Sequence, residues 1–223
     1  MKKIALFLLF AIIATIAPLT LFAQNGVHNG HRYVDLGLPS GTKWADCNVG
    51  ASSPTEYGNY YSWGETSTKS NYDCDTYKYG YNCVELTKYC TISDYCKNGF
   101  KDNKKELDLA DDVAHALWGG QWRMPTFEQI YELKKYTTSK WTSINDVWGR
   151  LFTAKNGNSI FLPAAGFRSG TLLYGAGSCG DYWSRTLYAD YPVRAGHLDF
   201  LSDDVKFDHD TRSYGFTVRP VRP

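Results

Sequence analysis

Residues 47–100 form a long stretch in which apolar side chains recur neither at the two-residue period of a strand nor at the 3.6-residue period of a helix. The stretch is dense in Gly, Tyr, Ser, Asn and Thr, and it contains Cys74, Cys83, Cys90 and Cys96. Loops of this length in a compact domain are usually functional or cross-linked. We therefore expect a long ordered loop that local disulfides hold in place, because it has little core of its own.

The N-terminal residues indicate export. Two lysines precede a long apolar run, and the small residue Ala23 stands before the polar Gln24. This order matches the charged, hydrophobic and cleavage regions of a signal peptide, so we expect residues 1–23 to be removed. The alternative is an uncleaved anchor, because the run is about as long as a membrane span. No cysteine follows the expected cleavage site directly, which argues against a lipid-anchored protein.

The remaining residues, 24–223, suit a single domain. Removing the two leader lysines from 24 basic residues leaves 22 against 23 acidic ones, a net charge of about −1. This balance gives no bulk attraction to nucleic acid or anionic lipid, and we expect neither as a partner. No later segment is long and apolar enough to span a membrane. We expect a protein that is secreted, or located in the periplasm or on the outer cell surface.

The six cysteines all belong to this mature part: Cys47, Cys74, Cys83, Cys90, Cys96 and Cys179. In an exported protein an even count favours a disulfide set over a metal site. The sequence does not determine the pairing.

Secondary-structure patterns predict two helices among short strands. An apolar repeat at helical spacing covers residues 104–118, and Thr126 with Gln129 forms a capping-box pattern that starts a second helix. Strand pairs are expected within residues 33–45, around a Pro-Ser-Gly turn, and within residues 151–162. The second pair surrounds an Asn-Gly turn, which supplies the positive φ angles of a tight hairpin.

Two further patterns have no predicted chemistry. The glycines of residues 175–180 match G-x-G-x-x-G, but the chain continues into strand-like Asp181-Tyr182-Trp183-Ser184 where a dinucleotide site requires a helix. No G-x-S-x-G nucleophile motif occurs. His28 and His31 are expected in a frayed N-terminus and His115 on the first helix. We therefore expect no catalytic residue, no cofactor and no enzyme.

The final segment, residues 182–221, is the candidate binding region. Its apolar ends are expected to be core strands, whereas its middle mixes aromatic, arginine and hydrogen-bonding side chains as binding surfaces do. An ordinary set of solvated strands and loops is the alternative. The candidate ligand-binding residues are Arg185, Tyr188, Tyr191, Arg194, His197, Asp199, Lys206, Asp208, His209, Asp210, Arg212 and Tyr214.

Calcium binding and carbohydrate stacking are two alternative uses of side chains in this chain. Five acidic residues of this segment are able to offer oxygen ligands to Ca²⁺, but their spacing matches no EF-hand loop, and a solvated acidic strand edge explains them without a metal. These are Asp199, Asp203, Asp204, Asp208 and Asp210. The tryptophans at positions 63, 118, 122 and 183 are able to stack on a carbohydrate, but they adjoin glycines or apolar strand ends, and we assign them to the core.

Several consecutive motifs together resemble the Fibrobacter succinogenes major paralogous domain family over nearly the whole mature chain. The motifs are Asp35-Leu36-Gly37-Leu38-Pro39-Ser40-Gly41-Thr42-Lys43-Trp44-Ala45, Cys47-Asn48-Val49-Gly50-Ala51, Trp63-Gly64-Glu65-Thr66, Trp118-Gly119-Gly120-Gln121-Trp122-Arg123-Met124-Pro125-Thr126, Asn158-Ser159-Ile160-Phe161-Leu162-Pro163-Ala164-Ala165-Gly166, Tyr182-Trp183-Ser184 and Val218-Arg219-Pro220-Val221. The resemblance implies an exported protein of the Bacteroidetes type. It also implies an α+β, C-type-lectin-like fold, in which two helices flank short antiparallel sheets beside long loops.

The resemblance implies a non-enzymatic module that displays residues 185–214 to an extracellular protein or glycan. The same fold includes formylglycine-generating enzymes, but the late cysteine pair of those enzymes is absent, since no cysteine follows Cys179. The calcium motifs of the lectin branch are absent as well. A divergent enzyme of the formylglycine-generating type and a structural cell-surface or fimbrial component remain the alternatives. Several residues of the segment stand where asparagine is usual in relatives, as adenine-directed diversification by a retroelement or ordinary drift would leave them.

Overall fold

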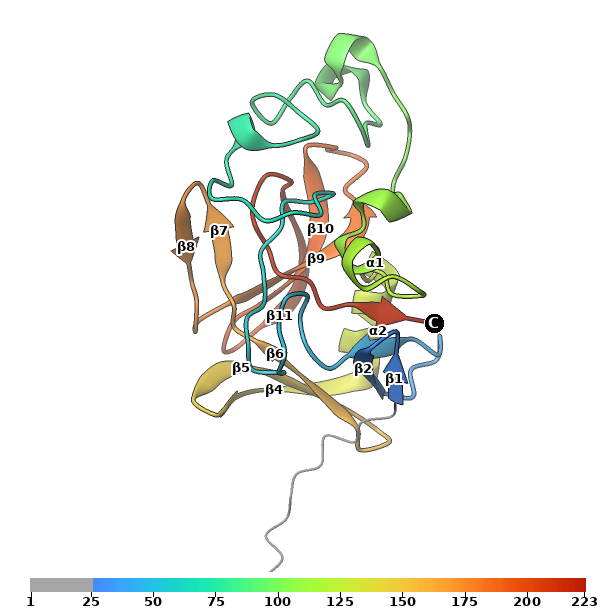
Figure 1. Cartoon of the computed structure of the whole chain (residues 1–223), viewed down its shortest axis with the longest axis vertical. Helices are drawn as coiled ribbons and strands as arrows, with labels where there is room; N and C mark the ends of the chain where they lie inside the picture. Colours follow the sequence, from blue (N-terminus) through green and yellow to red (C-terminus); the bar gives the residue numbers. More distant parts are fainter. Residues whose placement is uncertain (1–25) are drawn as a thin grey trace, which may run out of the picture.

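The computed structural model describes residues 26–223, and the predicted signal peptide, residues 1–23, lies outside the described residues. The architecture is α+β, as predicted: small antiparallel sheets surround two short α-helices, and a long loop covers one end (Figure 1). No helix in the described part combines the length and hydropathy that a bilayer crossing requires. The sheets have the strand orders β1-β2-β3-β12, β11-β10-β9, β4-β5-β6 and β7-β8.

The strands are β1 Gly26–His28, β2 His31–Asp35, β3 Lys43–Ala45, β4 Thr137–Ile144, β5 Val147–Ala154, β6 Ser159–Pro163, β7 Phe167–Ser169, β8 Leu172–Tyr174, β9 Gly180–Leu187, β10 Arg194–Phe200, β11 Val205–Thr211 and β12 Val221–Arg222. The α-helices are α1 Val113–Trp118 and α2 Phe127–Tyr136, and 3₁₀ turns occur at η1 Cys74–Thr76, η2 Ser93–Tyr95, η3 Lys97–Gly99 and η4 Leu109–Asp111.

The sheet β1-β2-β3-β12 joins the two ends of the described chain. The predicted first hairpin is confirmed, since β2 and β3 pair around the Pro-Ser-Gly turn, and β12 adds to β3. Buried Arg219 closes this region: it donates to the Asn48 side chain at 2.7 Å and to the Phe161 carbonyl at 2.9 Å. The expectation of a frayed N-terminus is wrong, because His31 lies in β2 and stacks on Trp118 with ring centroids 3.7 Å apart.

The helices follow the predictions in part. The capping box of α2 is confirmed, because the Thr126 hydroxyl accepts from the Gln129 N–H and the Gln129 side chain accepts from the Thr126 N–H. The first helix begins only at Val113, much later than predicted. Residues 105–107 instead pair with β9, and the buried Asp112 carboxylate caps the short helix by accepting from the His115 N–H at 3.1 Å.

The two hairpins of the sheet β4-β5-β6 use different turns. The β4–β5 turn has two residues with positive φ, Asn145 at 49° and Asp146 at 62°. This is the type I′ geometry. The predicted β5–β6 hairpin is confirmed, but only Gly157 has a positive φ there, and Ala154 N–H donates to the Asn158 carbonyl across a three-residue loop.

Two apolar clusters form the core. One contains Trp63, Trp122, Trp183 and Phe216, and the other contains Trp44, Phe152 and Leu162 with the inner faces of β9 and β10. The assignment of the tryptophans at positions 63, 118, 122 and 183 to the core is confirmed, since all four are buried. Glycines 175–180 lead into β9 and not into a helix, as expected for a sequence that only mimics a dinucleotide-binding loop.

The long loop is ordered around two local disulfides. Cys74 pairs with Cys83 and Cys90 with Cys96, which confirms local cross-linking. The other two cysteines are outside the disulfide set, because Cys47 and Cys179 are free thiols. Burial raises the pKa of Cys47 to about 11, and burial together with the Asp181 carboxylate raises the pKa of Cys179 to about 12. Both thiols are therefore protonated at neutral pH, and neither is an activated nucleophile.

Candidate functional site

The candidate residues of β11 lie on opposite faces of the sheet β11-β10-β9, because side chains alternate along a strand. Phe207 and His209 face α2, where Phe207 meets Phe127 with ring centroids 4.0 Å apart. Lys206 and Asp208 face the other way. The sequence segment therefore does not present its candidate residues as one surface.

On the side that faces α2, His209 stacks on Tyr188, with ring centroids 3.8 Å apart and planes 21° from parallel. Both side chains are half-buried. Burial lowers the pKa of His209, although the neighbouring Asp208 carboxylate opposes this effect. The pair lies beside Phe207, so it is a packed part of the α2–β11 contact with one open edge.

On the opposite face, Lys206 lies between two carboxylates. Its Nζ is 3.1 Å from Asp199 Oδ2 and 3.1 Å from Asp208 Oδ2. Hydrogen bonds to Asp208 and Asp199 raise the pKa of Lys206 to about 12. Burial raises the pKa of Asp199 despite this contact. Among residues 26–223 no group of His, Cys, Asp and Glu side chains is placed to hold a metal ion.

The acidic residues have a structural use at the outer edge of β11. Arg212 N–H donates to the Val193 carbonyl, which shows which residues of β11 form hydrogen-bonded pairs with β10. The residues between them, every second one along β11, point their N–H groups away from β10. Three such groups are capped by the carboxylate of the preceding residue, at 2.7–2.8 Å: Asp204 accepts from Val205, Asp208 from His209 and Asp210 from Thr211. The acidic residues thus occupy donors that an incoming strand would need.

Two candidate residues are buried. His197 is 4% exposed and packs against Trp183 and Phe216, with its Nε2 3.4 Å from Asp181 Oδ1. Arg212 is 1% exposed and binds the long loop. Neither side chain reaches the molecular surface.

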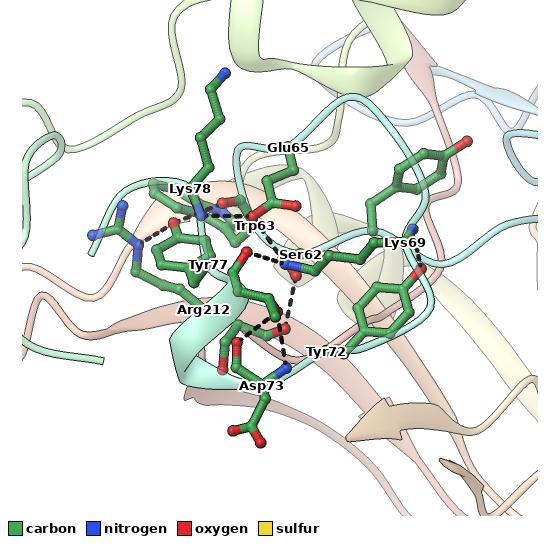
Figure 2. Close-up of polar contacts among 12 residues, drawn as sticks. Ser62, Trp63, Glu65, Lys69, Tyr72, Asp73, Tyr77, Lys78 and Arg212 are labelled. Carbon is green, nitrogen blue, oxygen red and sulfur yellow. Dashed lines mark hydrogen bonds and ion pairs between the residues drawn. The ribbon is translucent and has the colours of Figure 1, made fainter. Parts of the chain in front are cut away.

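Arg212 makes the most connected contact between the final segment and the long loop. Its guanidinium donates to the Tyr77 hydroxyl at 2.8 Å and to the carbonyls of Lys88, Tyr89 and Pro192 at 3.0–3.2 Å. Tyr77 in turn donates to the Trp63 carbonyl at 2.8 Å. Figure 2 shows this chain of contacts beside Glu65, whose carboxylate accepts from the Lys78 N–H at 2.9 Å. The Trp63-Gly64-Glu65-Thr66 motif therefore organises the loop around a buried cation.

Arg185 and Tyr214 also make contacts within the protein that use part of each side chain. Arg185 donates to the Leu107 carbonyl at 3.0 Å and lies 3.3 Å from the Glu106 carboxylate, which fixes the strand-like residues before α1. Tyr214 stacks on Phe167 of β7 with ring centroids 5.9 Å apart. Both side chains are half-buried.

Two exposed candidate residues lie together in the β9–β10 loop and at the start of β10, whereas exposed Lys206 lies apart from them on β11. Tyr191 and Arg194 are exposed, and the Arg194 guanidinium carbon is 5.7 Å from the centroid of the Tyr191 ring. Tyr95 of the long loop meets Tyr191 edge-on, with centroids 5.0 Å apart. We call Tyr95, Asp190, Tyr191 and Arg194 the tip surface. It lies where the long loop meets the β9–β10 loop, at the upper end of the molecule in Figure 1.

The long loop supports the tip surface from below. Val193 packs with Leu86, Cys90 and Cys96, so the Cys90–Cys96 disulfide is part of the apolar base. The Thr91 hydroxyl donates to the Ala189 carbonyl at 2.6 Å. Sequence reasoning missed Tyr95 and Thr91, because they are distant in sequence from the segment that they contact. A tyrosine beside a loop cysteine was the only signal available.

The chain was compared with known proteins in three ways, and no family model, no curated protein and no solved structure matches it.

Proposed function

We propose that the protein is an exported, non-enzymatic binding module whose tip surface contacts an extracellular protein or glycan. The single observation that carries this proposal is the exposed contact of Tyr191 with Tyr95 and Arg194. Tyr and Arg are the side chains that contribute most at protein interfaces, and an aromatic ring beside hydrogen-bonding groups suits a sugar equally well.

The support beneath the tip surface favours binding. Val193 is packed against a disulfide, and the Pro192 carbonyl accepts from buried Arg212 at 3.0 Å. Side chains on a backbone that is already ordered lose less entropy when they bind a partner. The cross-links of the long loop therefore have a functional interpretation: they hold one half of a two-part contact surface.

Only some of the candidate residues that the sequence indicated belong to the tip surface. Buried His197 and Arg212 support the surface, and the residues on the two faces of β11 lie outside it. Tyr191 and Arg194 of the tip surface are positions at which the family resemblance implies asparagine. Retroelement diversification of the segment would thus act on the tip surface, and a template repeat of the gene's 3′ end beside a reverse transcriptase gene would be its genomic mark.

The test is a screen of the purified protein on arrays of glycans and surface proteins, followed by paired variants. Tyr191→Ala with Arg194→Ala should weaken any binding found by at least about tenfold, the effect of losing one interface contact of 1.4 kcal/mol. The matched control is Tyr136→Ala with Lys135→Ala, since Lys135 Nζ lies 5.4 Å from the Tyr136 ring on α2. Equal losses in both pairs, or a loss in neither, would contradict the proposal.

A further inference from the structure

A cavity of about 370 Å³ is lined by residues of β2, by the end of β4 and by β6. The strands β2 and β4 lie at the end of the molecule opposite the long loop (Figure 1). Its size is within the range of small-molecule sites, which is about 300–1,000 Å³. The cavity shares no residue with the tip surface, and a ligand there would bind independently of any partner of the tip surface.

The floor of the cavity is aliphatic. Val34 of β2 and Ile160 of β6 are buried side chains that line it, and Ile144 at the end of β4 completes the floor. Among the described lining residues the one aromatic side chain is Phe161, which is 1% exposed and offers no open ring face. Val34 and Ile160 are almost as buried, so the accessible aliphatic surface comes from half-buried Ile144 and Pro54. A sugar that stacks on an aromatic ring is therefore a poor match, whereas a hydrocarbon group suits this floor.

The wall of the cavity offers hydrogen-bond donors. Arg32 follows the same face of β2 as Val34, and its Nε donates to Asp46 Oδ2 at 2.7 Å, which orients the guanidinium. In the described part of the chain, no group accepts a hydrogen bond from its two terminal nitrogens. A planar pair of N–H groups that a protein carboxylate already orients matches the two oxygens of a ligand carboxylate.

Asn145 adds a second polar group. The type I′ turn between β4 and β5 holds Asn145 with φ 49°, and this residue lines the cavity. Its side chain is exposed in this turn and carries an amide, which is able to donate and to accept hydrogen bonds. A cavity with an aliphatic floor and a few polar groups at fixed positions is the usual form of a small-molecule site.

We propose that this cavity binds a small organic carboxylate with an aliphatic body, whose carboxylate pairs with the terminal nitrogens of Arg32 and whose hydrocarbon part covers Ile144 and Pro54. Because Asp46 balances the charge of Arg32, the aliphatic body supplies much of the affinity. Binding should therefore strengthen about fourfold for each methylene that the cavity accommodates.

The experiment is a titration of the purified chain by ligand-observed NMR with butanoate, 4-methylpentanoate and 4-methylpentanamide. We expect saturable binding of 4-methylpentanoate with a dissociation constant of about 1 mM or lower. Butanoate should bind more weakly, and the amide, which has the same body without the charge, should bind at least about tenfold more weakly. Absence of saturable carboxylate binding, or equal binding of the amide, would overturn the proposal.

Variants locate the site. Arg32→Gln should reduce carboxylate binding at least about tenfold, whereas Lys101→Gln, which removes an exposed cation after the long loop, should leave it unchanged. Since Arg32→Gln also breaks the contact with Asp46, a second variant avoids that pair: Thr55→Trp places a large ring in the lining of the cavity and should block binding while the protein remains folded. Undiminished binding in Thr55→Trp would place the ligand elsewhere and overturn the assignment.

Discussion

The guanidinium of Arg212 lies 4.8 Å from the ring centroid of Trp63, and the Tyr77 hydroxyl connects the two residues by accepting from Arg212 and donating to the Trp63 carbonyl. This contact joins the end of β11 to the start of the long loop. The loop has no strands of its own beyond isolated bridges. Its position therefore depends on buried polar contacts and on the two disulfides more than on a sheet.

Replacing Arg212 by Met should destabilise the protein by about 3 kcal/mol, because the carbonyls of Lys88, Tyr89 and Pro192 would lose their buried donor. Chemical denaturation measures the change. The rate of amide hydrogen exchange should increase most in residues 77–93 of the long loop. Arg194→Met, on the surface, is the control and should change the free energy of unfolding by less than about 0.5 kcal/mol. A similar small effect for Arg212→Met would refute the role assigned to it.

Removing the Cys90–Cys96 disulfide should loosen the tip surface. Cys90→Ser with Cys96→Ser is expected to cost about 2 kcal/mol and to increase hydrogen exchange in residues 188–194, because Val193 packs on this pair. Cys74→Ser with Cys83→Ser removes the other disulfide of the loop and serves as the matched control. This control should increase hydrogen exchange in residues 188–194 less than loss of the Cys90–Cys96 disulfide does. A larger increase in the control would contradict the support that Cys90–Cys96 is proposed to give the tip surface.

Removing the caps of the β11 edge should promote self-association. Asp208→Ala with Asp210→Ala exposes the N–H groups of His209 and Thr211, which an edge strand of another molecule is then able to pair with. Light scattering at increasing protein concentration measures association. Asp73→Ala with Asp75→Ala changes the net charge equally at the 3₁₀ turn η1 of the long loop, and it should remain monodisperse under the same conditions.

The Asp111 carboxylate should make the long loop sensitive to acid. Burial acts to raise its pKa, but hydrogen bonds from Lys88, Tyr79 and Tyr89 outweigh burial, and the pKa is lowered in the folded protein. A carboxyl group with a lowered folded pKa stabilises the protein above its unfolded pKa, and this contribution is lost as pH falls through the folded value. Unfolding free energies between pH 6 and pH 3 should therefore fall less steeply below about pH 4 in Asp111→Asn than in the parent chain. Parallel pH profiles would count against this role.

The thiol of Cys179 should react slowly at neutral pH. Burial and the Asp181 carboxylate raise its pKa to about 12, so its alkylation rate should keep rising with pH well above pH 9. Asp181→Asn removes the negative charge and should speed alkylation at pH 8 several-fold, whereas Asp75→Asn should not. Mass spectrometry of Cys179 peptides measures the rates, and an unchanged rate in Asp181→Asn would contradict the electrostatic cause.

Local patterns predicted local structure well. The capping box at Thr126 and the Asn-Gly hairpin depend on neighbouring residues, and both are present. The helix at residues 104–118 was predicted too long, because residues 105–107 pair with β9, a partner distant in sequence. A helical repeat of apolar residues does not reveal such competition between local and long-range hydrogen bonds.

The sequence by itself determined the α+β character, the local cross-links of the long loop, the tryptophan core and the segment that mixes contact-type residues. Only the tertiary structure decided which of those residues are available. Strand alternation divides β11 between two faces, burial assigns Arg212 to the long loop, and packing brings Tyr95 to Tyr191. The physical reason is that exposure and partnership depend on which distant segments pack together, and a sequence pattern reports only on near neighbours along the chain.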